Sequence, residues 1–373
     1  MWQTEARVDL DAIRDNVSRL KPDSGAGLMA VVKADGYGHG MVPATRAALA
    51  GGATWLGVCT IEEALGLREA GITAPVLAWL LSPGLELHRA IAAEVDLSAA
   101  SVPLLGEIAA AARQAGRTAR THLKVDTGLT RGGSTTADWP ALVEAAAKAQ
   151  ADGSIEVVGI WSHFAYADEP GHPTIARQIA AYAEALEVAA RYGVRPAYRH
   201  LANSAATLTL PETHYDLVRP GIAVYGYSPV PGTTARYGLR PAMTLRARVM
   251  LAKRVPAGEG VSYGHQYTTS RETTVAVVPL GYADGITRAA TNRGPLLLGG
   301  QRRTIAGRVC MDQFVVDVGD DPVVAGDVAT VFGPGDDGEP TADDWAEVLD
   351  TISYEIVTRI GQRVPRTYHG EVV

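Results

Sequence analysis

Residues 28–40 read LMAVVKADGYGHG, in which five apolar residues are followed by a lysine and then by a glycine-rich loop. A strand buried on both faces of a parallel sheet reads as a continuous apolar run, so residues 28–32 predict such a strand. Lys33 then places an ammonium group directly after this buried strand, and that group must be solvated, paired or used in a reaction. The stretch alone favours a lysine that reaches from the strand end into solvent, because a single motif is a weak signal.

The same apolar pattern recurs along the first two thirds of the chain. Eight strand-like runs occupy residues 28–34, 54–60, 75–80, 95–100, 118–126, 155–164, 198–202 and 215–219. Stretches with helical periodicity, such as residues 61–70, 85–93 and 174–191, lie between most of them. Eight strands that alternate with helices predict an α/β fold of the (β/α)8 TIM-barrel type. A doubly wound sheet is the alternative, although no GxGxxG motif opens a helix after the first strand.

The chain changes character after about residue 240. Strand-like runs at residues 244–251, 274–280, 303–309 and 313–318 are separated by Gly, Pro and Asp turns, which predicts a mainly β domain. The sequence TADD at residues 341–344 predicts the start of its one clear helix. We expect a barrel domain at residues 1–235 and a β domain at residues 236–373, with residues 229–241 as the seam. About the first ten residues are a candidate to pair with the β domain.

Composition narrows the class of protein. The chain has 373 residues, 47% hydrophobic and 20% charged, with a formal net charge of -7, so it is globular and lacks the basic balance of a nucleic-acid binder. Its two cysteines, Cys59 and Cys310, offer neither a disulfide framework nor metal-ligand spacing, so we expect a reducing compartment and no metal site. The opening residues, MWQTEARVDLDAIRDNV, lack a signal-peptide core, and no run is long enough to span a membrane. These features predict a cytoplasmic protein with no membrane partner.

Polar residues follow the ends of several predicted strands, where a barrel carries its chemistry. Each alone can be explained as a cap, a turn or a core residue, but together they predict one pocket. They are Lys33, Arg131, His163, the pair Asn203 and Ser204, and the pair Arg219 and Gly221. The loops after the last two strands of barrels often bind phosphate. A lysine beside a phosphate cradle is what pyridoxal 5'-phosphate requires, because the lysine forms a Schiff base and the cradle holds the phosphate.

Longer motifs carry a resemblance to a known family. They are AVVKADGYGHG, DTGLTRGG, NSAAT, RPGIAVYG, GVSYGHQY, PLGYADG, GRVCMDQ and SYEIVTRIG. From about Val8 to Pro365 the chain resembles the alanine racemases. The resemblance implies pyridoxal 5'-phosphate as the cofactor and interconversion of L-alanine and D-alanine by two bases, which supplies D-alanine for cell-wall peptidoglycan.

The resemblance implies roles for individual residues around the cofactor. Lys33 would form the Schiff base and act as one catalytic base, Arg219 would face the pyridine nitrogen, and Arg131 would lie near the phenolic oxygen and the substrate carboxylate. His163 would pack beside the pyridine ring. The remaining cofactor-binding residues would be Tyr37, Asn203, Ser204, Gly221, Ile222 and Tyr354.

The other functional residues implied by the resemblance belong to the β domain. Tyr263 would be the second base, the backbone of Met311 would meet the substrate carboxylate with Asp312 beside it, and Tyr282 would line a narrow entrance. Thr130 departs from the family pattern, in which that position is often glycine, so the backbone of this loop does not follow from the resemblance.

Racemisation removes the α-proton from one face of an amino acid and returns a proton on the other, which two bases on opposite faces accomplish directly. A free phenol has a pKa of about 10, so Tyr263 needs nearby positive charge, for which the surroundings of His163 and Arg219 are candidates. The resemblance implies that this tyrosine comes from the partner subunit of a homodimer with shared active sites. Lys124 matches a position that carries a carbamylated lysine in some related racemases, and an ion pair with Asp126 or another acid is the alternative.

Three other functions are alternatives. A pyridoxal-phosphate decarboxylase of the same fold needs a site for a second carboxylate or amine, and the sequence offers none that we recognise. A broad-specificity amino-acid racemase is closer, but a constriction at Tyr282 opposes it. A non-catalytic pyridoxal-phosphate carrier has a small barrel without a β domain, whereas this chain has both.

Overall fold

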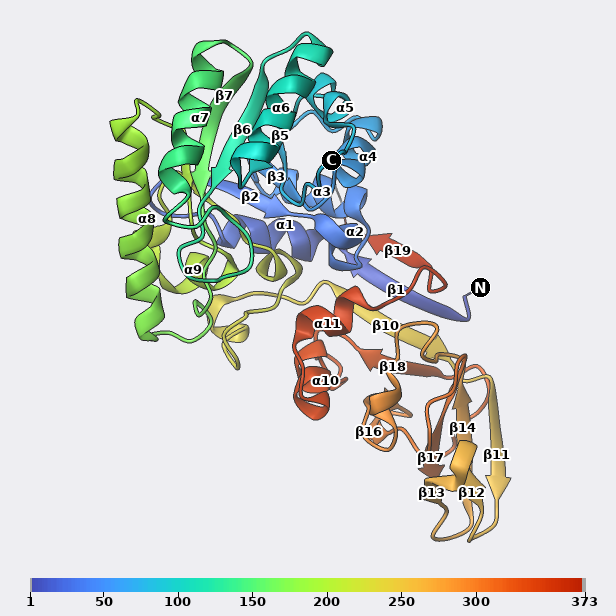
Figure 1. The fold of residues 1–373 in the computed structure, drawn as a ribbon. Coiled ribbons are helices and arrows are strands. Elements are labelled where there is room, and N and C mark those ends of the chain that lie inside the picture. Colours follow the sequence, from blue (N-terminus) through green and yellow to red (C-terminus); the bar gives the residue numbers. More distant parts are fainter. Residues whose placement is uncertain (1, 371–373) are drawn as a thin grey trace.

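The computed structural model describes residues 2–370, and its larger part is a barrel of eight parallel strands (Figure 1). Their order in the sheet is β8-β7-β6-β5-β4-β3-β2-β9, so nearly every strand lies beside the preceding strand of the chain. The strands are β2 (Gly27–Val31), β3 (Trp55–Val58), β4 (Val76–Ala78), β5 (Val95–Ala99), β6 (Ala119–Lys124), β7 (Ile155–Trp161), β8 (Tyr198–His200) and β9 (Leu217–Val218). The predicted (β/α)8 barrel is confirmed, and the sheet is not doubly wound.

The barrel closes where its last strands meet the first. β9 pairs in parallel with β2, and Leu217 lies opposite Gly27. Backbone hydrogen bonds join the chain around β8 to the chain around β9, from Asp216 N to Arg199 O (3.1 Å) and from Arg219 N to Ala202 O (2.9 Å). Both strands are shorter than the sequence predicted, because the chain at residues 201–203 and 219–221 turns into loops at the rim of the barrel.

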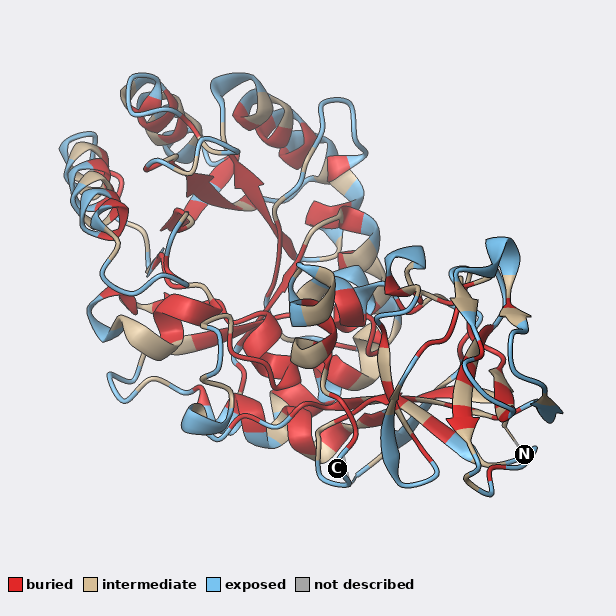
Figure 2. Ribbon diagram, turned by 90° about the horizontal axis from the view of Figure 1, so that it is seen from below, coloured by how far each residue is buried: buried red, intermediate tan, exposed pale blue. Residues whose placement is uncertain are grey.

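Helices surround the barrel with their buried faces toward the strands, as the view from below shows (Figure 2). They are α1 (Leu10–Arg19), α2 (Lys33–Tyr37), α3 (Met41–Ala50), α4 (Ile61–Glu69), α5 (Leu87–Ala92), α6 (Val102–Ala115), α7 (Trp139–Ala151), α8 (Pro173–Arg191) and α9 (Ser204–Thr209). Side chains define their starts: Thr60 and Glu63 form a capping box for α4, and Ser101 caps α6.

Glycines on the strands make room for large side chains inside the barrel. A Cβ on Gly57 would lie 2.5 Å from the ring of Trp79, and a Cβ on Gly159 would lie 2.2 Å from Nδ1 of His122. Real Cβ atoms do not approach neighbours this closely, so these two positions exclude any side chain. His122 is consequently fully buried on β6 in the middle of the barrel.

The second part of the molecule is built mainly from strands. A six-stranded sheet has the order β16-β15-β18-β10-β1-β19, a three-stranded sheet has the order β11-β14-β17, and β12 pairs with β13. The strands are β1 (Thr4–Asp9), β10 (Met243–Arg248), β11 (Leu251–Val255), β12 (Gly260–Val261), β13 (Tyr267–Thr268), β14 (Thr273–Val278), β15 (Pro295–Leu298), β16 (Gln301–Thr304), β17 (Phe314–Gly319), β18 (Val328–Phe332) and β19 (Arg366–His369). The N-terminal strand β1 thus lies between β10 and β19, antiparallel to the first and parallel to the second.

Two helices belong to this part, α10 (Ala342–Leu349) and α11 (Ser353–Thr358). Thr341 caps α10 in a capping box with Asp344, as its sequence predicted. The one clear helix of the sequence is α10, and α11 was not predicted because it is only six residues long and too short to show a helical period.

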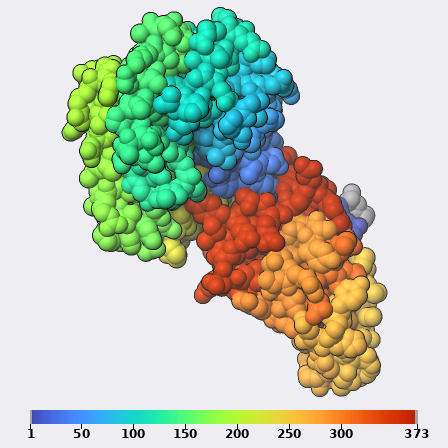
Figure 3. Space-filling view, in the orientation of Figure 1, coloured from blue at the N-terminus to red at the C-terminus, as the bar shows by residue number. Residues whose placement is uncertain are grey.

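The C-terminal helices join the two parts of the molecule. In the space-filling view the red C-terminal residues lie between the barrel and the rest of the β domain (Figure 3). A Cβ on Gly38 would lie only 2.5 Å from the carbonyl oxygen of Val357, and Nε of Arg366 donates to Gly38 O at 3.0 Å. This close approach brings the end of α11 to the rim of the barrel.

Candidate active site

A cavity of about 660 Å³ opens at the carboxyl ends of the barrel strands. Its size is typical of sites for a cofactor or a drug-sized ligand. Four cationic side chains line it, and no aspartate or glutamate of residues 2–370 does. The four cations are Lys33, Lys124, Arg131 and Arg219. An excess of positive charge in a concave, partly dry site favours anionic ligands.

Lys33 is presented by a strained turn. It lies two residues after β2, and the next residues of α2 have left-handed backbone angles, with φ of 53° at Ala34, Asp35 and Tyr37. This conformation costs L residues about 1–2 kcal/mol each. Glu63 helps to hold it, because its carboxylate accepts a 2.7 Å hydrogen bond from Ala34 N. Such strain persists where surrounding contacts enforce it, most often at functional sites.

Tyr37, Gly221 and Ser204 form a small cradle on one side of the cavity. A Cβ on Gly221 would lie 2.3 Å from the hydroxyl oxygen of Tyr37, so the phenol packs directly against bare backbone. Ser204 Oγ accepts hydrogen bonds from Gly221 N at 2.8 Å and Ala223 N at 3.4 Å, which leaves its own proton to donate. The N–H groups of Ser204 and Ile222 donate to no acceptor within residues 2–370. These unused donors, together with the Tyr37 hydroxyl, suit a bound phosphate.

Tyr354 places the β domain of the same chain against this cradle. It lies on α11, and its ring is tilted against that of Tyr37 with 6.2 Å between centroids. Tyr37 also stacks on Tyr225, with centroids 4.9 Å apart. Burial raises the pKa of Tyr37 and of Tyr354, so both phenols stay protonated and can donate hydrogen bonds.

Arg219 is a buried cation held by neutral acceptors. Its Nη1 donates to His200 O and its Nη2 to Ser162 O, both at 2.7 Å. Burial lowers the pKa of Arg219 to about 10, so the guanidinium keeps its charge at neutral pH. Its Nε makes no hydrogen bond within residues 2–370, and Arg219 lines the cavity. One N–H group is therefore left for a ligand.

His163 follows β7 and lies beside Arg219, with 3.5 Å between its Nδ1 and Nη2 of the arginine. Because a guanidinium only donates, Nδ1 must accept, and the imidazole carries its proton on Nε2. Burial, followed by the positive charges around it, holds the pKa of His163 well below its usual range. The ring is thus a neutral, flat surface at the cavity wall.

Lys124 ends β6 and is buried beside the indole of Trp161, with Nζ 4.3 Å from the ring centroid. Burial, with added repulsion from Arg219 and Arg131, lowers the pKa of Lys124 to about 8. The nearby Asp126 carboxylate acts in the opposite direction and raises this pKa, but it does not offset the lowering. The pairing of Lys124 with Asp126 or another acid stays a prediction.

Asp126 instead shapes the loop that carries Arg131. Its Oδ1 accepts hydrogen bonds from the backbone N–H groups of Gly128, Leu129 and Thr130 at 2.8, 3.0 and 3.1 Å. Thr130 has a φ of 55°, a left-handed value that glycine adopts easily and a β-branched residue rarely does. The loop therefore keeps a conformation suited to glycine, and the carboxylate stabilises it.

Eleven of the predicted site residues line this one cavity. They are Lys33, Tyr37, Lys124, Arg131, His163, Asn203, Ser204, Arg219, Gly221, Ile222 and Tyr354. Trp79, Trp161 and Cys59 also line it, and none of them was predicted as a site residue. Trp161 stands two residues before His163, so the alternation of side chains along β7 was a usable signal for it.

The other four predicted residues lie outside this cavity. Tyr263, Tyr282 and Met311 are exposed to 70%, 45% and 52%. They belong to neighbouring loops, because Tyr282 N donates to Cys310 O at 3.0 Å and Ser262 Oγ donates to Arg308 O at 2.7 Å. Ser262, directly before Tyr263, has a φ of 62° and so presents the tyrosine from a strained turn.

Asp312, the fourth of these residues, lies in the same group of loops. Arg363 bridges its carboxylate (2.8 Å) and that of Asp284 (3.2 Å). The loop that carries Tyr282 and the loop that carries Met311 and Asp312 are thereby fixed to each other as one surface of the β domain.

Two kinds of feature are absent from the described chain. No helix within residues 2–370 is long and apolar enough to cross a bilayer. The same residues contain no cluster of three or more His, Cys, Asp or Glu side chains able to hold a metal ion.

Comparison with known proteins gives consistent matches over the whole chain. Residues 8–229 match the family described as alanine racemase, N-terminal domain, and residues 242–368 match alanine racemase, C-terminal domain. An alanine racemase of Salinispora arenicola is 69% identical over 372 residues and covers 100% of both chains.

Solved structures also match over nearly the whole chain. The alanine racemase of D-cycloserine-producing Streptomyces lavendulae is 57% identical with a TM-score of 0.98, over 100% of this chain and 98% of that one. The alanine racemase of Bacillus anthracis with bound L-Ala-P is 35% identical with a TM-score of 0.91, over 100% of this chain and 97% of that one.

Proposed function

Because the chain belongs to the alanine racemase family, we propose that the cavity at the carboxyl ends of the barrel strands is the active site, with Lys33 and Tyr263 as its two bases. The enzyme is an isomerase that interconverts L-alanine and D-alanine. One observation carries the assignment of the site: a strand-end lysine shares the cavity with three other cations and no acidic residue of the described chain. Such a cavity favours a phosphate and a carboxylate together.

The residues present fit pyridoxal 5'-phosphate. Tyr37, Ser204 and the backbone of Ile222 would hold the phosphate beside Gly221, because they offer unused donors to one cavity and Gly221 tolerates no side chain against the Tyr37 hydroxyl. The free Nε–H of Arg219 suits an acceptor such as a pyridine nitrogen, and the neutral ring of His163 suits packing against a flat heterocycle.

When bound, pyridoxal 5'-phosphate supplies an electron sink for charge that develops at the α-carbon of an attached amino acid. Lys33 would hold the cofactor through Nζ in the resting enzyme and, once released, would take or return the α-proton on one face. Tyr263 would hold or give the proton on the opposite face.

The exposure of Tyr263 supports a dimer with shared sites. The side chain is 70% exposed and does not line the cavity of its own chain, although a strained turn presents it. A two-fold dimer would let each subunit place its Tyr263 in the cavity of its partner, because such symmetry makes the same surface meet itself twice.

The same exposed surface would complete the substrate site. Tyr282 and Met311 lie on loops fixed to each other and close to the loop of Tyr263, so all of them would reach the partner's cavity together. Arg131 and the backbone of Met311 would bind the carboxylate of alanine, with Asp312 beside it, and Tyr282 would narrow the entrance. This arrangement favours alanine over the larger substrates of a broad-specificity racemase.

Lys124 is the candidate for carbamylation. Its lowered pKa provides the neutral amine that reacts with carbon dioxide, because the nearby Asp126 carboxylate does not offset the lowering by burial, Arg219 and Arg131. A carbamate would place an anion between Arg131 and Arg219, both of which now repel the ammonium.

We expect the enzyme to supply D-alanine for cell-wall peptidoglycan in the cytoplasm. The two free cysteines, Cys59 and Cys310, support a reducing compartment.

A direct assay tests the proposal. The purified chain with added pyridoxal 5'-phosphate should convert L-alanine to D-alanine and back, and Lys33→Ala should abolish both directions. L-serine, L-lysine and L-arginine serve as comparison substrates. Racemisation of these amino acids at rates comparable to that of alanine would favour the broad-specificity alternative. Cofactor binding without any racemisation would favour the non-catalytic carrier.

A further inference from the structure

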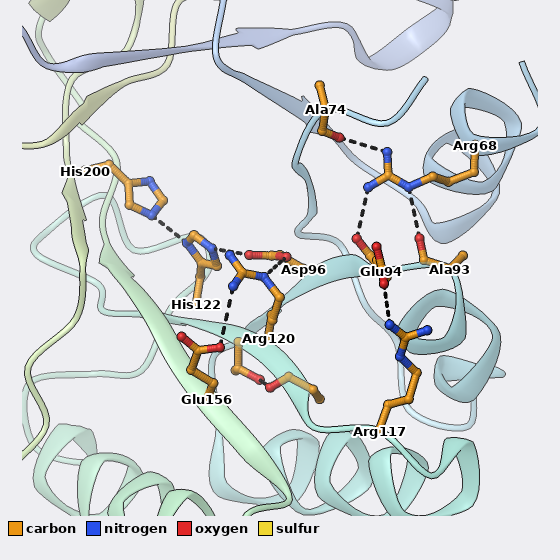
Figure 4. A network of polar contacts seen from close by, with 12 residues as sticks. Arg68, Ala74, Ala93, Glu94, Asp96, Arg117, Arg120, His122, Glu156 and His200 are labelled. Atoms are coloured by element: carbon orange, nitrogen blue, oxygen red, sulfur yellow. Dashed lines mark hydrogen bonds and ion pairs between the residues drawn. The ribbon is translucent and has the colours of Figure 1, made fainter. Parts of the chain in front are cut away.

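A chain of hydrogen bonds runs through the interior of the barrel, and Figure 4 shows its part from Asp96 through His122 to His200. Asp96 Oδ2 lies 3.1 Å from Nε2 of His122, and Nδ1 of His122 lies 2.9 Å from Nε2 of His200. Nδ1 of His200 lies 3.3 Å from Nη1 of Arg219. Asp96 stands near the start of β5, whereas Arg219 follows the end of β9, so the chain runs from the floor of the barrel to the cavity.

The two ends of this chain determine where its protons are. Arg219 can only donate, so Nδ1 of His200 must accept and its proton must be on Nε2. That proton is donated to Nδ1 of His122, which leaves the proton of His122 on Nε2, directed at Asp96. An ionised carboxylate only accepts, so it completes the sequence. Every bond then runs in one direction, and both imidazoles are neutral.

We propose that Asp96 and His122 are positioning residues for Arg219, and that the chain Asp96–His122–His200 fixes the guanidinium so that its Nε–H faces the bound cofactor. The inference rests on the role proposed above for Arg219. Neither Asp96 nor His122 lines the active-site cavity, so both would act through the residues between them and Arg219.

Because the chain of hydrogen bonds is buried, reversing the direction of any of its bonds would be costly in free energy. His122 and His200 have no exposed surface, and Asp96 is 1% exposed. A histidine in the wrong tautomer would set two donors or two acceptors against each other in a dry interior, where an unpaired polar group is costly. Gly159 also supports a defined position for the imidazole of His122, because a side chain at residue 159 would collide with it.

Asp96 has a second hydrogen-bond partner, which makes its substitution an informative test. Its Oδ1 accepts a 2.9 Å hydrogen bond from Nε of Arg120, and Arg120 in turn reaches Glu156 at 3.5 Å. Each carboxylate oxygen thus serves one donor. Asp96→Asn keeps the shape but has a single acceptor oxygen, so either Arg120 or His122 must then face an amide N–H.

The first test is the position of the protons. Nitrogen-15 NMR of histidine-labelled protein, assigned with the His122→Gln variant, should find both His122 and His200 neutral with the proton on Nε2, with or without pyridoxal 5'-phosphate. In Asp96→Asn a second tautomer should appear, whereas in Glu156→Gln the wild-type spectrum should remain. A proton on Nδ1 of His200 in the wild-type protein would overturn the proposal.

The second test is kinetic and uses a conservative pair. Glutamine can accept from His200 and donate to Asp96, so His122→Gln should keep most of the racemisation rate. His122→Phe fills similar space without hydrogen bonds and should lower kcat about tenfold or more with little change in KM, as loss of a positioning partner does elsewhere. Equal rates for the two variants, both folded and loaded with cofactor, would contradict the proposal.

Failure of this inference can be told apart from failure of the proposed function. The tautomers are read without any reaction, so they test the chain even in a protein that does not racemise alanine. Should Asp96→Asn not fold, the His122 pair and the wild-type spectrum decide the question alone.

Discussion

Carbamylation of Lys124 gives a prediction whose size can be worked out from the structure. Carbon dioxide reacts with the neutral amine, and the pKa of Lys124 is lowered from its ordinary 10.5 to about 8. At pH 7.5 roughly a quarter of such a side chain is neutral, against about one in a thousand for an unperturbed lysine. We therefore expect wild-type protein in ¹³C-bicarbonate to give a carbamate signal by NMR that strengthens as the pH rises from 7 to 8.5.

The matched variants are Lys124→Gln and Lys148→Gln. Lys148 is exposed on α7 and paired with Glu144, so its replacement should leave the signal unchanged. Lys124→Gln should remove the signal and also lower kcat/KM about tenfold or more. A charge-assisted hydrogen bond to Arg131, worth about 1.5–3 kcal/mol, would then be missing. A signal that survives in Lys124→Gln, or wild-type protein without any signal at pH 8.5, would refute the reasoning.

The same lowered pKa predicts a pH dependence of stability in bicarbonate-free buffer. Between about pH 8 and the ordinary lysine pKa of 10.5, the unfolded chain holds a proton on Lys124 that the folded chain has released. Stability should therefore rise with pH across this window, and below it the penalty of a buried ammonium should persist. Lys124→Met should flatten this part of the curve, and a wild-type curve that falls there would contradict the assignment.

Three further predictions concern backbone and cofactor. Gly221→Ala should weaken pyridoxal 5'-phosphate binding about tenfold or more, because its Cβ would lie 2.3 Å from the Tyr37 hydroxyl. The control Gly106→Ala, whose Cβ would have no atom within 4 Å, should bind the cofactor normally. Equal cofactor affinities of the two variants in a titration would contradict the proposed phosphate cradle. Thr130→Gly should raise the free energy of unfolding, measured by urea denaturation, by up to about 1 kcal/mol, because the φ of 55° at this position strains threonine and not glycine. A decrease of about 1 kcal/mol in the free energy of unfolding would contradict this strain. Borohydride reduction of the loaded enzyme should fix the label on Lys33, and recovery of the label on another lysine would reject it.

Regular features of the chain were predictable from sequence. The apolar runs that alternate with helical periods correctly predicted the barrel, because parallel strands buried on both faces leave a strong pattern. The polar residues at strand ends predicted one pocket, because parallel strands all end at the same rim. Lys33, Arg131 and Arg219 do line one cavity.

Features set by tertiary contacts were not predictable in this way. The left-handed turn at residues 34–37 depends on Glu63 from a distant helix, and the conformation of Thr130 depends on Asp126. The helix α11 is too short to show a period. The chain from Asp96 to Arg219 joins residues of four strands and their loops, and no local pattern marks residues that meet only inside a closed barrel.

The central claim is that one active site takes Lys33 from one subunit and Tyr263 from the other, and subunit mixing tests it most directly. Lys33→Ala and Tyr263→Ala homodimers each lack one base at every site and should be inactive. When they are mixed one to one and exchange subunits freely, about half of the dimers are heterodimers, and each of these has one intact site and one doubly defective site. We predict recovery of about a quarter of the wild-type racemase activity. Verified heterodimers that remain as inactive as either parent would contradict the claim.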